Sequence, residues 1–327
     1  MQHLNIAKPQ EDSLGGPYDQ VVEPSSAFDH RVLRKPFPFN LTHRNILALL
    51  LFLTTCAWFW RPLVDLFSLT QQQEHYSHLL LIPLVSLYVF YLDRKAIMAS
   101  EEWSPWFGSL LLGVGALGHW AADAEVWAPD HLAMAMLAFV VMCWGIFLFC
   151  FGMTVCRMVS FGLLFLLFMV PFPSAVLDAI IGFLQRSSAE ATDLLFSMIG
   201  IPVFREGFLF HLSNFSIHVA EECSGIRSAL SLFICSVVAG HFLLRSLWGK
   251  IGVAAIVIPL AIIKNAFRIV GLTLLANYVD PTFITGSLLH RSGGIPLFIV
   301  ALVVLLCLVW LVRRLEGKFA SPRCEKA

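Results

Sequence analysis

The sequence has little charge and lacks the short motifs that mark several common enzyme chemistries. Charged residues make up 13% of the chain, the formal net charge is +0, and no long basic block occurs, so we expect no nucleic-acid partner. HExxH, GxSxG, GxxxxGK and paired intramembrane aspartates are absent, which argues against zinc or serine hydrolysis, P-loop nucleotide binding and aspartyl proteolysis. The eight cysteines lack CxxC spacing and lie mostly in apolar runs, so we predict no disulfide, no metal site and no other cofactor.

Apolar residues dominate the chain and occur in long runs. They make up 58% of the sequence, and the mean hydropathy is +0.77. The runs are about 20 residues long, as in membrane-spanning helices, so we predict an all-α membrane protein, a polytopic bundle of about eight transmembrane helices. The predicted spans are approximately 45–67, 78–92, 106–122, 131–151, 157–170, 224–244, 251–277 and 294–312.

The placement of basic residues predicts the orientation of this bundle. With both ends in the cytoplasm, fourteen basic residues face inward and four face outward. We therefore predict a multi-pass protein of the cell (inner) membrane, with a disordered cytoplasmic tail (1–44), a transmembrane domain (45–312) and a basic cytoplasmic tail (313–327). No hydrophobic core of a signal peptide precedes Asn45. The inward set is Arg31, Arg34, Lys35, Arg44, Arg94, Lys95, Arg157, Arg245, Lys250, Arg313, Arg314, Lys318, Arg323 and Lys326, and the outward set is Arg61, Arg186, Arg205 and Arg291.

The outer loop 171–223 is the only large loop that this topology leaves. Residues 174–200 mix polar side chains such as Asp178 and Arg186 with apolar ones, which predicts an amphipathic helix near the membrane interface. Residues 208–219 alternate between apolar and polar types, which predicts a short β-hairpin. We expect this extracytoplasmic loop to act as a lid that separates a site at residue 223 from bulk solvent.

A polar heptad, Glu221–Arg227 (EECSGIR), lies directly against the sixth predicted span. Cys223 caps the outer end of that span, where the helix dipole and the amides of Ser224 and Gly225 favour a thiolate, whereas the two glutamates oppose one. The protonation state of Cys223 therefore stays open. A lone cysteine at the end of a span is usually a packing residue, but Cys223 lies within a polar segment. We treat it as the candidate nucleophile, supported by Ser224, Gly225 and Glu221.

Two cations occur inside the seventh predicted span. Arg268 lies 18 residues after Lys250, roughly 27 Å along a helix, near the outer edge of a hydrocarbon core about 30 Å thick. Lys264 is one turn deeper on the same face, and Asn265 lies between them. Snorkelling of Arg268 toward the outer interface is the alternative explanation. We expect Arg268 to reach the depth of Cys223, with Asn265 as a supporting residue.

Two histidines complete the candidate site. His290 lies in the last outer loop, and Gly293 and Gly294 just after it permit a close backbone approach. A loop histidine is by itself more often a solvent-exposed residue. His78 opens the second span on the outer side, where it either helps to line the site or lies among the lipid headgroups.

These residues resemble the exosortase/archaeosortase family of membrane transpeptidases. The resemblance rests on three motifs in order: Glu221-x-Cys223-Ser224-Gly225-Ile226-Arg227, then Asn265-x-x-Arg268, then His290 with Gly294 four residues later. Supporting similarity occurs at Tyr76-Ser77-His78 through Pro83, at Pro171-Phe172-Pro173 and at Gly200-Ile201-Pro202-Val203. The likeness covers roughly residues 45–312.

The resemblance implies a cysteine peptidase or transpeptidase whose active site is at the extracytoplasmic face of the membrane. Its substrates are expected to be exported proteins with a tripartite C-terminal sorting signal: a short motif such as Pro-Glu-Pro, a hydrophobic helix and a basic end. The implied roles are Cys223 as nucleophile, Arg268 as cation and His290 as proton-transfer partner. The expected partners are membrane lipid, the tailed proteins and an unidentified amine or lipid acceptor.

Two other functions fit the same residues. A membrane transporter would use Lys264, Arg268 and the glutamates as a pathway for an ion or a lipid-linked sugar, and Cys223 would be dispensable. A non-catalytic assembly factor for exopolysaccharide export would tolerate single substitution of Cys223, Arg268 and His290.

Overall fold

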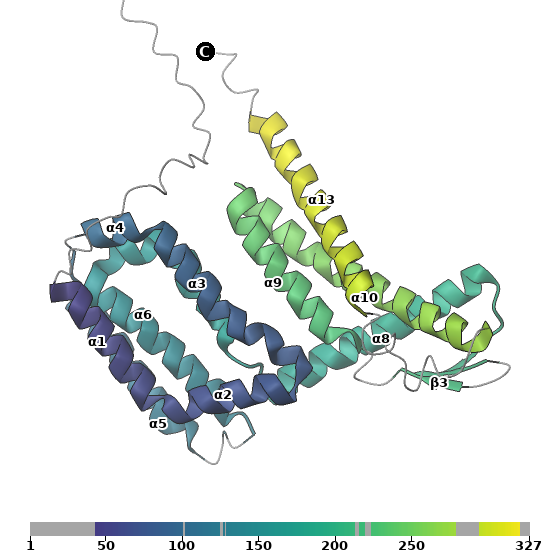
Figure 1. The fold of residues 1–327 in the computed structure, drawn as a ribbon, viewed down its shortest axis with the longest axis horizontal. Coiled ribbons are helices and arrows are strands. Elements are labelled where there is room, and N and C mark those ends of the chain that lie inside the picture. The colour runs from purple at the N-terminus through teal and green to yellow at the C-terminus, as the bar shows by residue number, and fades with distance from the viewer. Residues whose placement is uncertain are drawn as a thin grey trace, which may run out of the picture. The chain divides into compact units, whose positions relative to one another are not determined.

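The structure, a computed structural model, describes residues 43–100, 102–124, 127, 129–212, 216–219, 224–278 and 294–320 (Figure 1). Within these residues the chain is mostly helical. The helices are α1 (His43–Trp58), α2 (Trp60–Gln72), the 3-10 helix η2 (Glu74–Leu80), α3 (Leu81–Leu92), α4 (Arg94–Ala99), α5 (Pro105–Ala122), α6 (His131–Met158), α7 (Ser160–Phe165), the 3-10 helix η4 (Leu166–Met169), α8 (Ser174–Ile199), α9 (Ile226–Leu243), α10 (Leu247–Tyr278) and α13 (Gly294–Ala320).

These helices make the chain a polytopic all-α membrane protein, as predicted. By length and composition, the described residues hold five helices able to cross a membrane, or up to seven if each of two bent helix pairs is one span. The predicted count of eight is not confirmed. The five are His75–Leu92, His131–Met158, Ile226–Leu243, Leu247–Tyr278 and Gly294–Gly317, and the bent pairs are α1 with α2 and α7–η4 with α8.

Proline occurs at both bends, one inside the predicted span 45–67 and one directly after the predicted span 157–170. Between α1 and α2 the chain bends by 69°, and Pro62 lies in the first turn of α2, where its missing amide hydrogen is tolerated. Between η4 and α8 the bend is 86°. The segment Pro171–Pro173 carries two prolines there, and Pro173 is the residue before the first turn of α8. Both bends redirect the chain at positions where a continuous helix cannot form.

The N-terminal helices pack around α6. Helix α5 lies along α6, and α1, α2 and α7 also contact it (Figure 1). Helix α6 bends at Gly152, whose φ of 77° is readily adopted by glycine and rarely by other residues. The Glu102 carboxylate accepts bonds from the Thr154 amide at 3.2 Å and from its hydroxyl at 2.8 Å. The kink is therefore stabilised by a side chain from outside α6.

Glycine lets α5 and α6 approach each other closely. A Cβ on Gly108 would lie 2.5 Å from the Phe149 Cα, so Gly108→Ala should push α5 away from α6 and lower the unfolding free energy by about 1–3 kcal/mol. Gly113 on the same helix is the control, because a Cβ there meets nothing within 4 Å and alanine favours the helix by up to about 1 kcal/mol. Thermal unfolding in detergent tests this prediction. Equal shifts in melting temperature for the two variants would contradict it.

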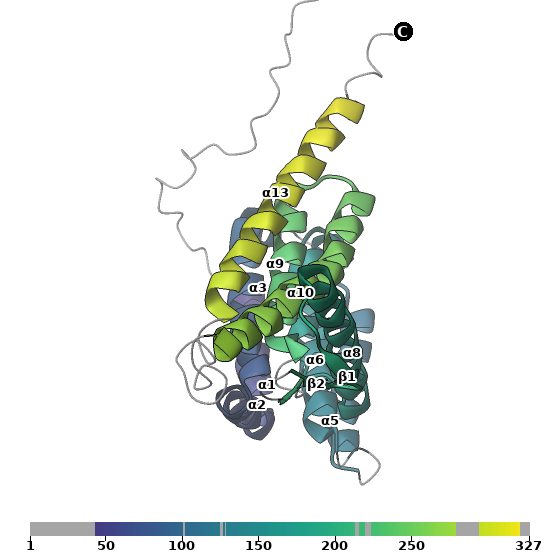
Figure 2. The same cartoon turned by 90° about the vertical axis from the view of Figure 1, so that its right-hand side faces the viewer.

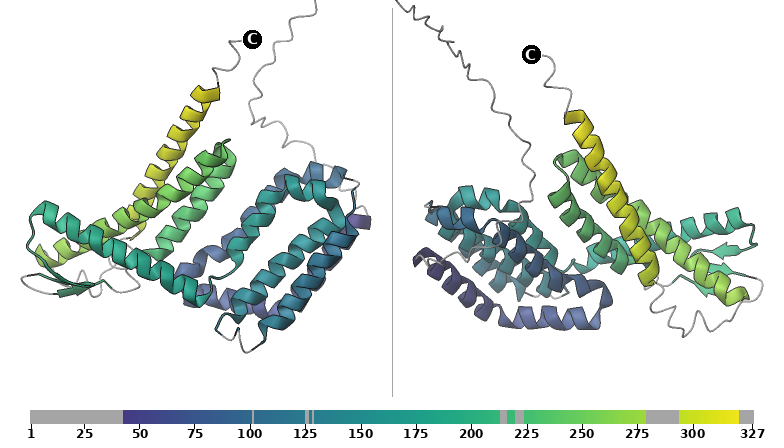
Figure 3. Two further views of the ribbon diagram at one scale, coloured as in Figure 1. Left: turned by 180° about the vertical axis from the view of Figure 1, so that it is seen from behind. Right: turned by 45° about the horizontal axis from the view of Figure 1, so that its top comes forward.

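The C-terminal helices pack around α10. Helices α8, α9 and α13 all contact α10, and α13 also contacts α9 (Figure 3). One apolar cluster joins α9, α10 and α13 and includes Leu232, Val257 and Leu305. The α9 side chains Ile234, Val237 and Val238 pack against the core of the N-terminal helices. Helix α9 therefore contributes to both packed groups.

A carboxylate on α13 fixes the turn between α9 and α10. Glu316 accepts hydrogen bonds from the Arg245 amide at 2.9 Å and from the Ser246 amide at 3.1 Å. These amides precede the first turn of α10, where N–H groups have no helical acceptor and a negative charge is favoured by the helix dipole. The contact ties α13 to the start of α10.

The segment 208–219, predicted to form a short hairpin, contains β2 (Leu209–His211) and β3 (Ser216–His218), which form a three-stranded antiparallel sheet with β1 (Phe204–Glu206) (Figure 2). Phe204 pairs with His211 and Phe210 pairs with Ile217. Phe210 and Val219 are buried in one cluster with Phe196 of α8 and Val270 of α10. The alternating pattern thus packs one face of the sheet on the helices.

Candidate active site

The structure describes five of the eight predicted site residues. Ser224, Gly225, Asn265, Arg268 and His78 are described, whereas Cys223, Glu221 and His290 lie outside the described residues. The described chain ends at Val219 and resumes at Ser224 around Cys223, and it ends at Tyr278 and resumes at Gly294 around His290.

The turn that leads into α9 requires glycine at position 225. Gly225 precedes α9 with φ 78° and ψ 12°, a left-handed conformation that is disfavoured for residues with a Cβ. A Cβ on Gly225 would also lie 2.9 Å from the Cγ and Oδ1 of Asn265. Glycine at position 225 is therefore required both by the backbone conformation and by the Asn265 side chain opposite.

Asn265 joins the three helices around this turn. It belongs to α10, is only 1% exposed, and donates a hydrogen bond from Nδ2 to the Ser188 Oγ of α8 at 3.1 Å. Its other side lies against Gly225. Asn265 thus fixes the start of α9 relative to α8 and α10.

The chain that approaches residue 223 from the sheet is also held by α8. Buried Gln185 donates a hydrogen bond from Nε2 to the Val219 carbonyl at 2.7 Å. Val219 itself is buried, and its amide donates to the Phe208 carbonyl at 2.9 Å. The described residues on either side of the 220–223 segment, Val219 and Ser224, are therefore both in buried positions.

A cavity of about 530 Å³ opens at the start of α9. Four elements contribute to its wall: η2, α9, α10 and α13. The described residues that line it are His75, Ser77, Gly225, Ile226, Arg227, Ser228, Ser231, Lys264, Arg268, Gly294, Ile295 and Phe298. Three of these side chains are cationic, and the described part of the lining contains no carboxylate. Such a lining favours negative charge in the cavity.

Lys264 is the most deeply placed of these cations. It is 7% exposed, and its Nζ donates a hydrogen bond to the Ser228 hydroxyl of α9. Arg268 lies one turn further along α10, as the predicted common face required. A buried lysine beside an arginine inside an apolar helix carries a large desolvation cost, which the polar cavity reduces.

A profile of the transmembrane exosortase family (EpsH) matches residues 70–307, well over half of the 327-residue chain. The chain belongs to the transmembrane exosortase family. Comparisons with curated proteins and with solved structures gave no match. The exosortase match spans every described residue that lines the cavity, from His75 to Phe298.

Two residues of η2 line the cavity of this exosortase, and the predicted supporting residue His78 is not one of them. His78 is 8% exposed and is not among the described lining residues, whereas His75 and Ser77 are. Ser228 and Ser231 were also missed. Their spacing of three and six residues from Gly225 puts them along one face of α9, and this spacing is the signal that would have found them. In the described part of the chain, no three His, Cys, Asp or Glu side chains gather where they could hold a metal ion.

Proposed function

We propose that this exosortase is a cysteine peptidase or transpeptidase that cleaves C-terminal sorting signals of exported proteins. The proposed signal has a short motif such as Pro-Glu-Pro, a hydrophobic helix and a basic end. The proposed roles are Cys223 as nucleophile, Arg268 as cation and His290 as proton-transfer partner. The proposal rests on family membership and on the sequence at the start of α9.

The observation that carries the proposal is the cationic cavity at the start of α9. Residue 223 is covalently next to Ser224 at this helix start, and Arg268 and Gly225 line the cavity. Family membership supports a transpeptidase in general. An intramembrane cavity that favours negative charge suits acyl transfer, because the carbonyl oxygen of the scissile bond becomes an oxyanion.

The first half of the proposed reaction forms a thioester. The Cys223 thiol gives its proton to His290, and the resulting thiolate attacks the scissile carbonyl carbon. Arg268 stabilises the oxyanion because guanidinium stays protonated. The buried Ser224 hydroxyl, which has no hydrogen-bond partner among the described residues, is a further donor beside the nucleophile. Collapse of the tetrahedral intermediate breaks the C–N bond, and the leaving amine takes a proton from His290.

The second half releases the acyl group. His290 removes a proton from an incoming amine or water, whose nitrogen or oxygen attacks the thioester carbonyl. The C–S bond then breaks and the Cys223 thiolate is restored. An amine or lipid acceptor gives transpeptidation, and water gives hydrolysis.

The proposed topology places this chemistry at the extracytoplasmic face. Eight spans with both termini in the cytoplasm put residues 223 and 290 on one side, together with the outer end of α9. A substrate whose tail is a membrane helix would present its cleavage site at that level. This explains why a peptidase site would lie at the edge of a helix bundle.

The test is co-expression with a secreted reporter that ends in a motif, an apolar helix and a basic end. We expect a shorter reporter on a gel when the exosortase is present, and an uncut reporter when the motif is scrambled and the rest of the tail is kept. Mass spectrometry of the new C-terminus separates an amine adduct from a free carboxylate. Failure to cut any tailed reporter would favour the transporter or the non-catalytic assembly factor.

A further inference from the structure

Helix α8 presents an apolar stripe that no described part of the protein covers. Val176, Phe183, Leu194 and Met198 are 45%, 52%, 62% and 74% exposed. Their spacings of seven, eleven and four residues put them on one line along the helix. Ile180, Ser187 and Ala191 lie along the same line, and the charged Glu190 lies at its edge, seven residues after Phe183 and four before Leu194.

The other two faces of α8 have different surroundings. Leu184, Ser188, Thr192 and Phe196 form a buried face, and α8 packs on α10. A third face carries exposed Arg186 and the half-exposed Asp193, and exposed Glu190 and Ser197 lie at its border with the apolar stripe. One helix therefore has a protein-facing, a polar and an apolar surface.

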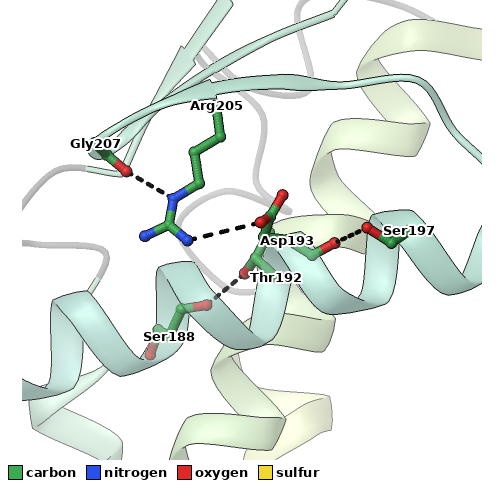
Figure 4. Close-up of polar contacts among 6 residues, drawn as sticks. All are labelled: Ser188, Thr192, Asp193, Ser197, Arg205 and Gly207. Carbon is green, nitrogen blue, oxygen red and sulfur yellow. Dashed lines mark hydrogen bonds and ion pairs between the residues drawn. The ribbon is translucent and has the colours of Figure 1, made fainter.

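The small sheet lies toward the polar side of α8. Arg205 of β1 places its Nη1 atom 3.8 Å from the Asp193 carboxylate, and its Nε donates to the Gly207 carbonyl at 2.8 Å (Figure 4). Figure 4 shows this arginine above the α8 turns that carry Thr192, Asp193 and Ser197. The sheet thus contacts the buried and polar faces of α8 and leaves the apolar stripe uncovered.

The direction of α8 identifies what covers this stripe. The Ser160–Met169 helix segment packs beside α3, part of a candidate membrane span, and α8 turns away from it by 86°. A helix perpendicular to a span runs along the membrane surface. A surface helix with one apolar and one charged face lies in the interface, with its apolar face among the acyl chains.

We propose that the stripe Val176, Phe183, Leu194 and Met198 is a lipid-binding surface that seats α8 in the membrane interface. The occupant is the phospholipid bilayer, because α8 follows a helix segment packed beside a candidate membrane span and lies nearly perpendicular to that segment. The buried face of the same helix carries Gln185 and Ser188, which hold Val219 and Asn265. Lipid contact along α8 therefore sets the depth of the cavity relative to the membrane surface.

Photo-crosslinking in nanodiscs of phosphatidylethanolamine and phosphatidylglycerol tests this surface without an activity assay. A diazirine amino acid is incorporated at position 183, 194 or 198, and at position 186 or 193 of the polar face as the matched control. We expect several-fold more lipid adduct, measured by mass spectrometry, at the apolar positions than at the control positions.

Each other outcome overturns the proposal. Equal lipid labelling on both faces would place α8 inside the bilayer as a re-entrant segment. Labelling by water alone on both faces would place it in solvent, and crosslinks to a second copy of the chain at positions 183 and 194 would make the stripe a protein interface. Because cleavage is not measured, these results are independent of the proposed reaction.

Discussion

Replacing Cys223 with alanine is expected to abolish cleavage of a tailed reporter. A covalent mechanism has no nucleophile without the thiol, so turnover should fall by at least about 10³-fold. Cys223→Ser should also be inactive or nearly so, because a hydroxyl is far less ionised than a thiol near neutral pH. The measurement is the rate of reporter shortening at equal amounts of membrane-inserted protein.

The control for this prediction is a second cysteine on the same helix. Cys235 of α9 packs against the apolar cluster between α9, α10 and α13, and it is not among the described lining residues of the cavity. Cys235→Ala should leave turnover within about twofold, since a small apolar residue replaces a thiol that serves as packing. Normal cleavage by Cys223→Ala would end the proposal that this exosortase uses a cysteine nucleophile.

Gly225→Ala is expected to give the second large loss of turnover. The left-handed backbone at Gly225 costs an alanine about 1–2 kcal/mol, and the new Cβ would press on Asn265 at 2.9 Å. The start of α9 must then shift, and with it the residue before Ser224. A displacement of about 1 Å at a reacting group lowers turnover by roughly 100-fold.

Gly200→Ala separates backbone strain from this displacement. Gly200 ends α8 with φ 77°, almost the same backbone conformation, but a Cβ there meets nothing within 4 Å. Both variants should lose similar unfolding free energy from strain, whereas only Gly225→Ala should lose most of its turnover. Equal turnover in the two variants would show that the Gly225–Asn265 contact does not position the site.

The sequence predicts the long spans well because a long apolar run in a membrane forms a helix that satisfies its own backbone hydrogen bonds. The runs 131–151, 224–244, 251–277 and 294–312 correspond to α6, α9, α10 and α13, and the exosortase resemblance is confirmed by the family match. The bends were not predicted, although Pro62 and Pro171–Pro173 are visible in the sequence. A proline permits a bend, but only the packing of the neighbouring helices decides its angle.

The site was predicted less completely than the spans. Glycine at 225 and Asn265 were selected from motif spacing, and the structure brings them into contact across 40 residues of sequence. His75, Ser231 and the Gln185 bond to Val219 were not predicted. These depend on which face of a 3-10 helix or an interfacial helix turns inward, and hydropathy patterns carry little of that information.

The Glu316 contact anchors α13 near one of its two ends. Its C-terminal part is attached to the turn before α10, and a Cβ on Gly249 would already lie 2.5 Å from the Glu316 Oε1 atom, so that part of the helix has little room to move. The opposite end, Gly294 to Phe298, forms part of the cavity wall. Because α13 is one continuous helix attached at Glu316, the cavity can widen on its α13 side only if α13 rotates about Glu316.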